Sequence, residues 1–215
     1  FIDHGRRDEV STYVTALARE FADDRRIASW SAYNEGDHVP EKFPYVSMDQ
    51  VISFYSDTTA LIRSVDSHHL ITADVARIQN TPLTQDFVDY VSFHYYDDPA
   101  RLATEISTLR GNLDRPMPIV AGELGRLSSG DHRASVSSQS VAVATYLDTA
   151  LQGESSVAGA LIWSLVDQNT PRTPLSRGPD KGTIKYGMFD GDLQPKPVAA
   201  VVQRYFSGGC GPGQR

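Results

Sequence analysis

Cysteine is almost missing from this sequence: among its 215 residues the only one is Cys210. A single cysteine cannot form a disulfide within the chain, and Cys210 lies in the glycine-rich end "SGGCGPGQR", where no catalytic thiolate is expected. The cysteine content therefore argues against thiol chemistry. It leaves the cellular location undetermined, with secretion as one option, because secreted proteins without disulfides are common.

Long apolar runs and clusters of basic residues are missing as well. No stretch of about 18 apolar residues occurs, so no membrane-spanning helix and no membrane partner are expected. The net charge is -7, and the Lys and Arg residues are scattered along the chain, which argues against a nucleic-acid partner. A soluble globular protein that acts on a neutral or polymeric substrate fits this composition better.

Two further patterns that carry specific chemistry are absent. No glycine-rich phosphate loop follows any apolar run, which disfavours a nucleotide cofactor. No His-x-His pair occurs, and the adjacent His68 and His69 are expected near the carboxyl end of a helix rather than at a metal. We therefore expect neither a cofactor nor a metal ion.

The sequence does contain a regular alternation of helical and strand patterns. Helical spacing of apolar residues predicts helices at 8–24, 48–65, 101–113, 136–151 and 197–206, and short apolar runs predict strands at 27–33, 70–73, 89–93, 119–121 and 157–164. This order predicts an α/β fold with a parallel sheet. Such units build either an open doubly wound sheet or a closed (β/α)8 barrel, the TIM barrel. The missing phosphate loop favours the barrel.

Only five strands can be counted, and the first element is a helix. We therefore expect residues 1–206 to form an incomplete TIM-barrel domain, from the helix after strand three to the last helix, with 207–215 as a flexible tail. Either another segment or chain completes the barrel, or the sheet is open at one side. The start at Phe1, without a methionine or a signal-like segment, suggests a trimmed or partial polypeptide.

Two glutamates end apolar runs: Glu35 closes "IASWSAYNE" and Glu123 closes "PIVAGE". The carboxyl ends of parallel strands are where such folds place their chemistry. Two carboxyl groups so placed suggest glycoside hydrolysis, in which one protonates the leaving oxygen and the other attacks the sugar or activates water.

Four motifs occur in a fixed order along the chain: "WSAYNE", "SFHYY", "VAGE" and "LIWS". This order resembles the retaining β-glycosidases of clan A, most closely the cellulase- and mannanase-like glycoside hydrolase family five. The resemblance implies that Glu35 is the acid/base at the end of strand four and Glu123 the nucleophile on strand seven. The arginine on strand two and the histidine on strand three of that family have no counterpart here.

The same resemblance implies four substrate-binding residues, namely Asn34, His94, Tyr96 and Trp163. The hydroxyl of Tyr96 would hold a carboxylate ionised and oriented, and the ring of Trp163 would stack on a sugar. Packing in the core is the alternative for these aromatic side chains and for His94.

Each of the two glutamates also has a non-catalytic interpretation. The pKa of Glu35 should be raised by burial or by the second carboxylate if Glu35 is the acid, whereas an ion pair with an arginine is the alternative. Glu123 could instead cap a helix. Gly122 is expected to leave room for a sugar ring beside Glu123.

The sequence thus predicts a retaining β-glycosidase that hydrolyses a β-linked poly- or oligosaccharide through two glutamates. The alternative from another functional class is a non-catalytic, carbohydrate-binding remnant of a barrel. The sequence does not distinguish among possible glycan substrates, nor between internal and terminal cleavage.

Overall fold

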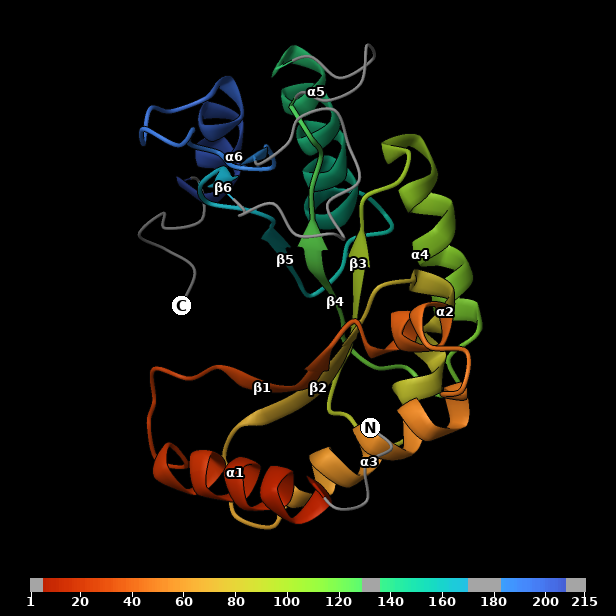
Figure 1. Ribbon diagram of the computed structural model, residues 1–215. Helices are drawn as coiled ribbons and strands as arrows, with labels where there is room; N and C mark the ends of the chain where they lie inside the picture. The colour runs from red at the N-terminus through yellow and green to blue at the C-terminus, as the bar shows by residue number, and fades with distance from the viewer. Residues whose placement is uncertain (1–5, 129–135, 170–182, 208–215) are drawn as a thin grey trace. The chain divides into compact units, whose positions relative to one another are not determined.

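A computed structural model describes residues 6–128, 136–169 and 183–207 of the chain (Figure 1). The chain divides into two compact units. The first unit comprises Phe1–His94 and Glu105–Gly122, and the second comprises Tyr95–Thr104 and Glu123–Arg215. Each unit is described by itself below.

Five strands form one sheet in the order in which they occur in the sequence. They are β1 (Ser29–Asn34), β2 (Leu70–Val75), β3 (Val91–Tyr95), β4 (Ile119–Leu124) and β5 (Gly159–Ile162). The pairs β1–β2 and β2–β3 are parallel. The prediction of an α/β chain with a five-stranded parallel sheet is therefore confirmed.

Two long helices, α1 (Arg7–Glu20) and α3 (Met48–Arg63), pack against each other in the first unit (Figure 1). Helix α3 begins at a capping box, in which Ser47 and Gln50 each accept a hydrogen bond from the other's backbone N–H. Its buried residues recur at helical spacing and are Val51, Tyr55, Thr58, Thr59 and Ile62. This spacing explains why the sequence pattern located α3 correctly.

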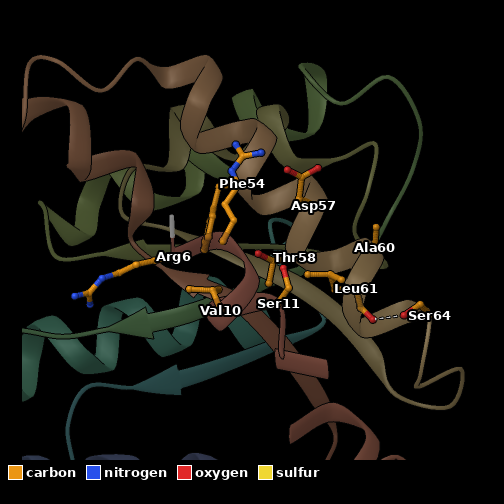
Figure 2. Close-up of a pocket in the computed structure, with 10 residues that line it drawn as sticks. Arg6, Val10, Ser11, Phe54, Asp57, Thr58, Ala60, Leu61 and Ser64 are labelled. Carbon is orange, nitrogen blue, oxygen red and sulfur yellow. Dashed lines mark hydrogen bonds between the residues drawn. The ribbon is translucent and has the colours of Figure 1, made fainter. Parts of the chain in front are cut away.

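A cavity of about 550 Å³ lies between α1 and α3 (Figure 2). Its walls include the apolar side chains of Val10, Phe54 and Leu61, and its polar lining includes Arg6 and Asp57. None of the candidate site residues predicted from the sequence lines this cavity. The cavity is thus separate from the carboxylate of Glu35.

Short helical segments follow the ends of β1 and β2. The chain after β1 forms a 3-10 turn at Gly36–His38 and then α2 (Val39–Lys42), and the chain after β2 forms a 3-10 helix at Ile78–Thr84. The sequence pattern predicted neither segment, because each is too short to show a helical period.

Helices α5 (Val136–Leu147) and α6 (Pro197–Ser207) lie side by side in the second unit (Figure 1). They share an apolar cluster built on Val143, Leu147 and Val198. The remaining elements of this unit are a 3-10 turn at Pro99–Arg101, a π-helical turn at Asp148–Gln152, and the antiparallel strands β6 (Gln168–Asn169) and β7 (Thr183–Ile184). Most of helix α4 (Leu102–Gly111) belongs to the first unit.

The sequence also predicted a flexible tail at 207–215 and no membrane-spanning helix. Nearly all of the predicted tail, residues 208–215, lies outside the described residues. Within the part of the chain that the structure describes, no helix has the length and the apolar character needed to cross a membrane.

A buried carboxylate, that of Asp66, ties three segments of the first unit together. It accepts hydrogen bonds from Trp30 Nε1 at 2.7 Å, from His69 Nδ1 at 2.6 Å, and from the backbone N–H groups of His68 and His69. The Nε2 atom of His69 lies 3.1 Å from the carbonyl oxygen of Asp24. His69 is therefore a buried structural residue in the loop between α3 and β2, and its partners are the carboxylate of Asp66 and the carbonyl of Asp24.

The Asp66–His69 pair shifts both pKa values. Burial raises the pKa of Asp66, but the hydrogen bonds from Trp30 and His69 outweigh this effect and lower it well below 3.8. The hydrogen bond to Asp66 raises the pKa of His69 above 6.5. The stabilisation by Asp66 is present above about pH 4 and is lost as the pH falls further. The stabilisation by charged His69 is present below about pH 6.5 and is lost as the pH rises through its raised pKa.

We predict that His69→Leu destabilises the protein most between about pH 4.5 and 6, with a smaller loss at pH 9. Urea unfolding of the wild type and the variant, once within this acidic range and once at pH 9, measures the loss in the free energy of unfolding at each pH. His68→Leu is the matched control, because the side chain of His68 is 65% exposed. An equal loss at both pH values would show that the charge of His69 adds nothing to stability.

A second buried ion pair stabilises the second unit. Lys196 Nζ donates to Asp167 at 2.8 Å and to the hydroxyl of Ser128 at 3.0 Å, and Asp167 also accepts from the backbone N–H of Gly187 at 2.7 Å. The side chains of Lys196 and Asp167 are 10% and 6% exposed. The pair joins the segment before α6 to the chain that follows β5.

Lys196→Met is expected to destabilise the protein by about 3–5 kcal/mol, because it leaves the charge of Asp167 buried and unpaired. The double variant Lys196→Met/Asp167→Asn should be more stable than this single variant, since the amide oxygen of the new asparagine still accepts from Gly187. Thermal unfolding of both variants tests the order. A double variant that is less stable than Lys196→Met would contradict this account.

Candidate active site

Glu35 directly follows β1, and its half-buried carboxylate meets a histidine from β3. The Nδ1 atom of His94 lies 2.8 Å from Glu35 Oε1, and the side chains of His94 and Glu35 are 2% and 31% exposed. Both residues belong to the first unit. The partner of Glu35 is thus a buried histidine, and within the described residues no ion pair between Glu35 and an arginine is found.

The pKa of Glu35 is lower than its usual 4.5, whereas the sequence led us to expect a raised value. The hydrogen bond from His94 is the largest cause of this lowering. Burial raises the pKa but by less, and the charges of His94, His38 and Lys42 lower it further. In this arrangement Glu35 is an ionised acceptor, and it must gain a proton before it can act as an acid.

Asn34, the last residue of β1, lies beside β2. Its Cα pairs with that of Asp74 across the parallel ladder, where a change of register interrupts the pairing after Ser31. The side chain of Asn34 is exposed. It is therefore available to a ligand at the carboxyl end of β1.

Gly122 is needed for the close packing of neighbouring strands, and the reason we expected for it is wrong. A Cβ atom at this position would lie 2.5 Å from Ser92 Oγ, 2.8 Å from Asp74 Oδ1 and 3.4 Å from His94 Cδ2. The first two of these contacts are too short for ordinary packing, so polar side chains of β2 and β3 fill the space beside Gly122. A sugar ring has no room there.

Glu123, the fifth residue of β4, receives a hydrogen bond in the second unit. The hydroxyl of Tyr96 donates to Glu123 Oε2, and the ring of Tyr96 packs against Tyr186 with centroids 5.2 Å apart. A Cβ atom at Gly125 would lie 2.7 Å from Tyr96 Cε1 and 3.1 Å from Tyr186 Cδ1. The two tyrosines thus fit closely over a glycine, which fixes the direction in which the Tyr96 hydroxyl points.

Trp163 follows β5 and is 38% exposed. Its backbone N–H donates to the carbonyl of Leu124 at 3.0 Å, which fixes the backbone of the tryptophan beside the end of β4. An indole this exposed is not core packing alone. It offers an apolar surface on which a ligand can stack.

The structure brings two pairs of predicted residues together, Glu35 with His94 and Glu123 with Tyr96. It also identifies residues that sequence reasoning missed. Asp74 and Ser92 adjoin His94 at Gly122, and Tyr186 supports Tyr96. A signal for Tyr186 was present, because Tyr186 opens the loop segment "YGMFDGDLQPKP" before the last predicted helix, and loops often carry functional residues.

Replacing His94 by phenylalanine should raise the pKa of Glu35, because the hydrogen bond and the charge that lower it disappear while burial remains. The δ-carbon resonance of Glu35 in a carbon-13 NMR titration measures this pKa, and Glu35→Gln assigns the signal. His38→Asn should give a smaller rise, since His38 acts only through its charge. An unchanged pKa in the His94 variant would overturn our explanation of the Glu35 shift.

Comparisons with known proteins agree on the fold alone. No protein-family model and no curated protein sequence matches the chain. Among solved structures, it resembles a GH2 β-galacturonidase from Eisenbergiella tayi with a TM-score of 0.74 at 16% identity, covering 96% of this chain and 38% of that one.

It also resembles a β-D-glucuronidase from Dictyoglomus thermophilum with a TM-score of 0.71 at 17% identity, covering 92% of this chain and 36% of that one. For a thermostable mutant xylanase from Cellvibrio japonicus, the TM-score is 0.69 at 14% identity, covering 96% of this chain and 72% of that one. The chain thus spans well under half the length of the first two proteins. Its structural neighbours are glycoside hydrolases, and it shares their fold over most of its own length.

Proposed function

We propose that the protein is a retaining β-glycosidase that hydrolyses a β-linked poly- or oligosaccharide by double displacement. Glu35 serves as the general acid and then the general base, and Glu123 serves as the nucleophile. The observation that carries the proposal is the pairing of both strand-end glutamates with side chains of one short segment: His94 contacts Glu35, and Tyr96 contacts Glu123.

The partner of each glutamate suits the role that we assign to it. A nucleophilic carboxylate must be ionised and correctly oriented, and the Tyr96 hydroxyl supports both by donating a hydrogen bond. An acid/base must exchange a proton, and the hydrogen bond from His94 holds the Glu35 carboxylate in place while lowering its pKa. The Tyr96 contact thus favours the ionised form of Glu123 that attack requires, and the His94 contact favours ionised Glu35, the form that acts as base in the second step.

The reaction follows from these roles. A carboxylate oxygen of Glu123 attacks the anomeric carbon while protonated Glu35 gives its proton to the leaving oxygen, so one C–O bond forms as another breaks. Glu35, now ionised, takes a proton from water, and the oxygen of that water displaces Glu123 from the sugar. Because His94 lowers the pKa of Glu35, the protonated form needed in the first step is favoured by acidic pH.

The remaining predicted residues bind the substrate in this proposal. Asn34 lies exposed beside the acid, and the partly exposed ring of Trp163 stacks on a sugar. The family-five resemblance rests on the four motifs, whereas the structural neighbours are a GH2 enzyme, a glucuronidase and a xylanase. Their names span several glycans, so we propose a β-linked glycoside without choosing its sugar.

We further propose that residues 1–206 are part of a (β/α)8 barrel whose first three strands come from another segment or chain. Two features support this. The five strands follow each other in sequence order, as consecutive barrel strands do, and the similar xylanase is only partly covered by this chain. In this proposal the five strands of the sheet correspond to strands four to eight of the barrel.

The test compares glycosides that differ only in their leaving group. Glu35→Gln should reduce kcat/KM by about two to four decades on a methyl or other poorly leaving glycoside, the usual contribution of acid catalysis, and much less on a dinitrophenyl glycoside. Glu123→Gln should abolish hydrolysis of both. Glu41→Gln is the matched control, because Glu41 is exposed and paired with Arg77.

Two outcomes would contradict the proposal. Wild-type rates in the Glu35 variant on the poor leaving group would remove its role as acid. Glycan binding measured by calorimetry, together with no hydrolysis by the wild type of any aryl glycoside or soluble polysaccharide, would instead favour a non-catalytic carbohydrate-binding protein.

A further inference from the structure

Glu35 has a backbone conformation that glutamate rarely adopts. Its φ is 53° and its ψ is 36°, in the left-handed region, and Leu193 is the only other non-glycine residue with positive φ in the described ranges. Such a conformation persists only where surrounding contacts enforce it. The contacts that enforce it at Glu35 therefore determine where its carboxylate points.

The first contact comes from Tyr55, a fully buried residue of α3. Its hydroxyl accepts the backbone N–H of Gly36 at 2.7 Å and donates to the carbonyl of Asp74 at 3.2 Å. The same carbonyl accepts the backbone N–H of Glu35 at 3.0 Å. Burial raises the pKa of Tyr55 above 10, so its hydroxyl stays protonated and able to donate.

The second contact comes from the carboxylate of Asp37, which is 2% exposed. It accepts the backbone N–H of Ala76 at 2.7 Å, the backbone N–H of Arg77 at 3.1 Å, and Asn80 Nδ2 at 2.9 Å. These three donors lie in the segment that follows β2. Asp37 thereby fixes the turn after Glu35 to the neighbouring strand end.

Gly36, between these two anchors, has no room for a side chain. A Cβ atom there would lie 2.7 Å from the Tyr55 hydroxyl oxygen and 3.3 Å from Tyr33 Cδ1. The backbone on both sides of the turn is therefore held by specific, buried partners, and the Glu35 side chain continues from it to His94 at 2.8 Å.

We propose that Tyr55 and Asp37 are positioning residues, which hold Glu35 in its left-handed conformation so that its carboxylate meets His94. The catalytic consequence rests on the proposed function of Glu35 as acid/base. The geometric claim does not, because it concerns only the direction of the Glu35 side chain. Neither residue touches the substrate in this proposal.

The test uses Tyr55→Phe and Asp37→Asn, which preserve side-chain volume. In each variant the contact between Glu35 and His94 should loosen, so the pKa of Glu35 measured by carbon-13 NMR should rise toward 4.5. On poorly leaving glycosides kcat should fall about 10- to 100-fold with KM changed less than about threefold, since small displacements of a catalytic group have effects of this size. On a dinitrophenyl glycoside the fall should be much smaller.

Tyr146→Phe is the matched control. Tyr146 is also fully buried, and its hydroxyl also donates to a backbone carbonyl, that of Asp97 at 2.5 Å. This control should lose stability comparably while leaving the Glu35 pKa and the dependence on leaving group unchanged.

The outcomes separate the two proposals. If the wild type hydrolyses no glycoside, the proposed function fails, and the NMR titration still decides the positioning claim. If the Glu35 pKa and the leaving-group dependence are the same in wild type, Tyr55→Phe and Asp37→Asn, the positioning claim fails, even in an active enzyme.

Discussion

The hydrogen bond between Glu35 and His94 is the interaction on which the candidate site depends. It joins the chain after β1 to the middle of the sheet, across 59 residues of sequence, and it lowers the pKa of the carboxylate. The side chain of His94 is 2% exposed and has little freedom to move, so it holds the carboxylate of Glu35 in place. Tyr55 and Asp37 hold the backbone of Glu35.

Buried polar pairs also define the scaffold around the site. Asp66 joins Trp30 and His69 in the first unit, and Asp167 joins Lys196 to the backbone of Gly187 in the second. Each of these carboxylates has several donors, which offset the cost of its burial. In both units, therefore, charged groups inside the protein are matched by specific partners rather than by solvent.

The sequence predicted the helices and strands in which apolar residues recur at a regular spacing. Strands and helices such as β2 and α3 were located because apolar residues recur at fixed spacing, and Glu35 and Glu123 were proposed as site residues because they end apolar runs. The lowered pKa of Glu35, the left-handed turn and the role of Gly122 could not be predicted. They depend on residues such as Asp37 and Ser92, which come together only in space and carry no local pattern.

In the proposed reaction, Glu123 attacks the sugar, and Glu35 first donates a proton to the leaving oxygen and then accepts one from water. Incubation of the protein with a 2-deoxy-2-fluoro glycoside that carries a dinitrophenyl leaving group tests this most directly, because the fluorine slows release of a covalent intermediate. Peptide mass spectrometry should then find the fluorosugar attached to Glu123. Attachment to any other residue, in a protein that the reagent inactivates, would contradict the account.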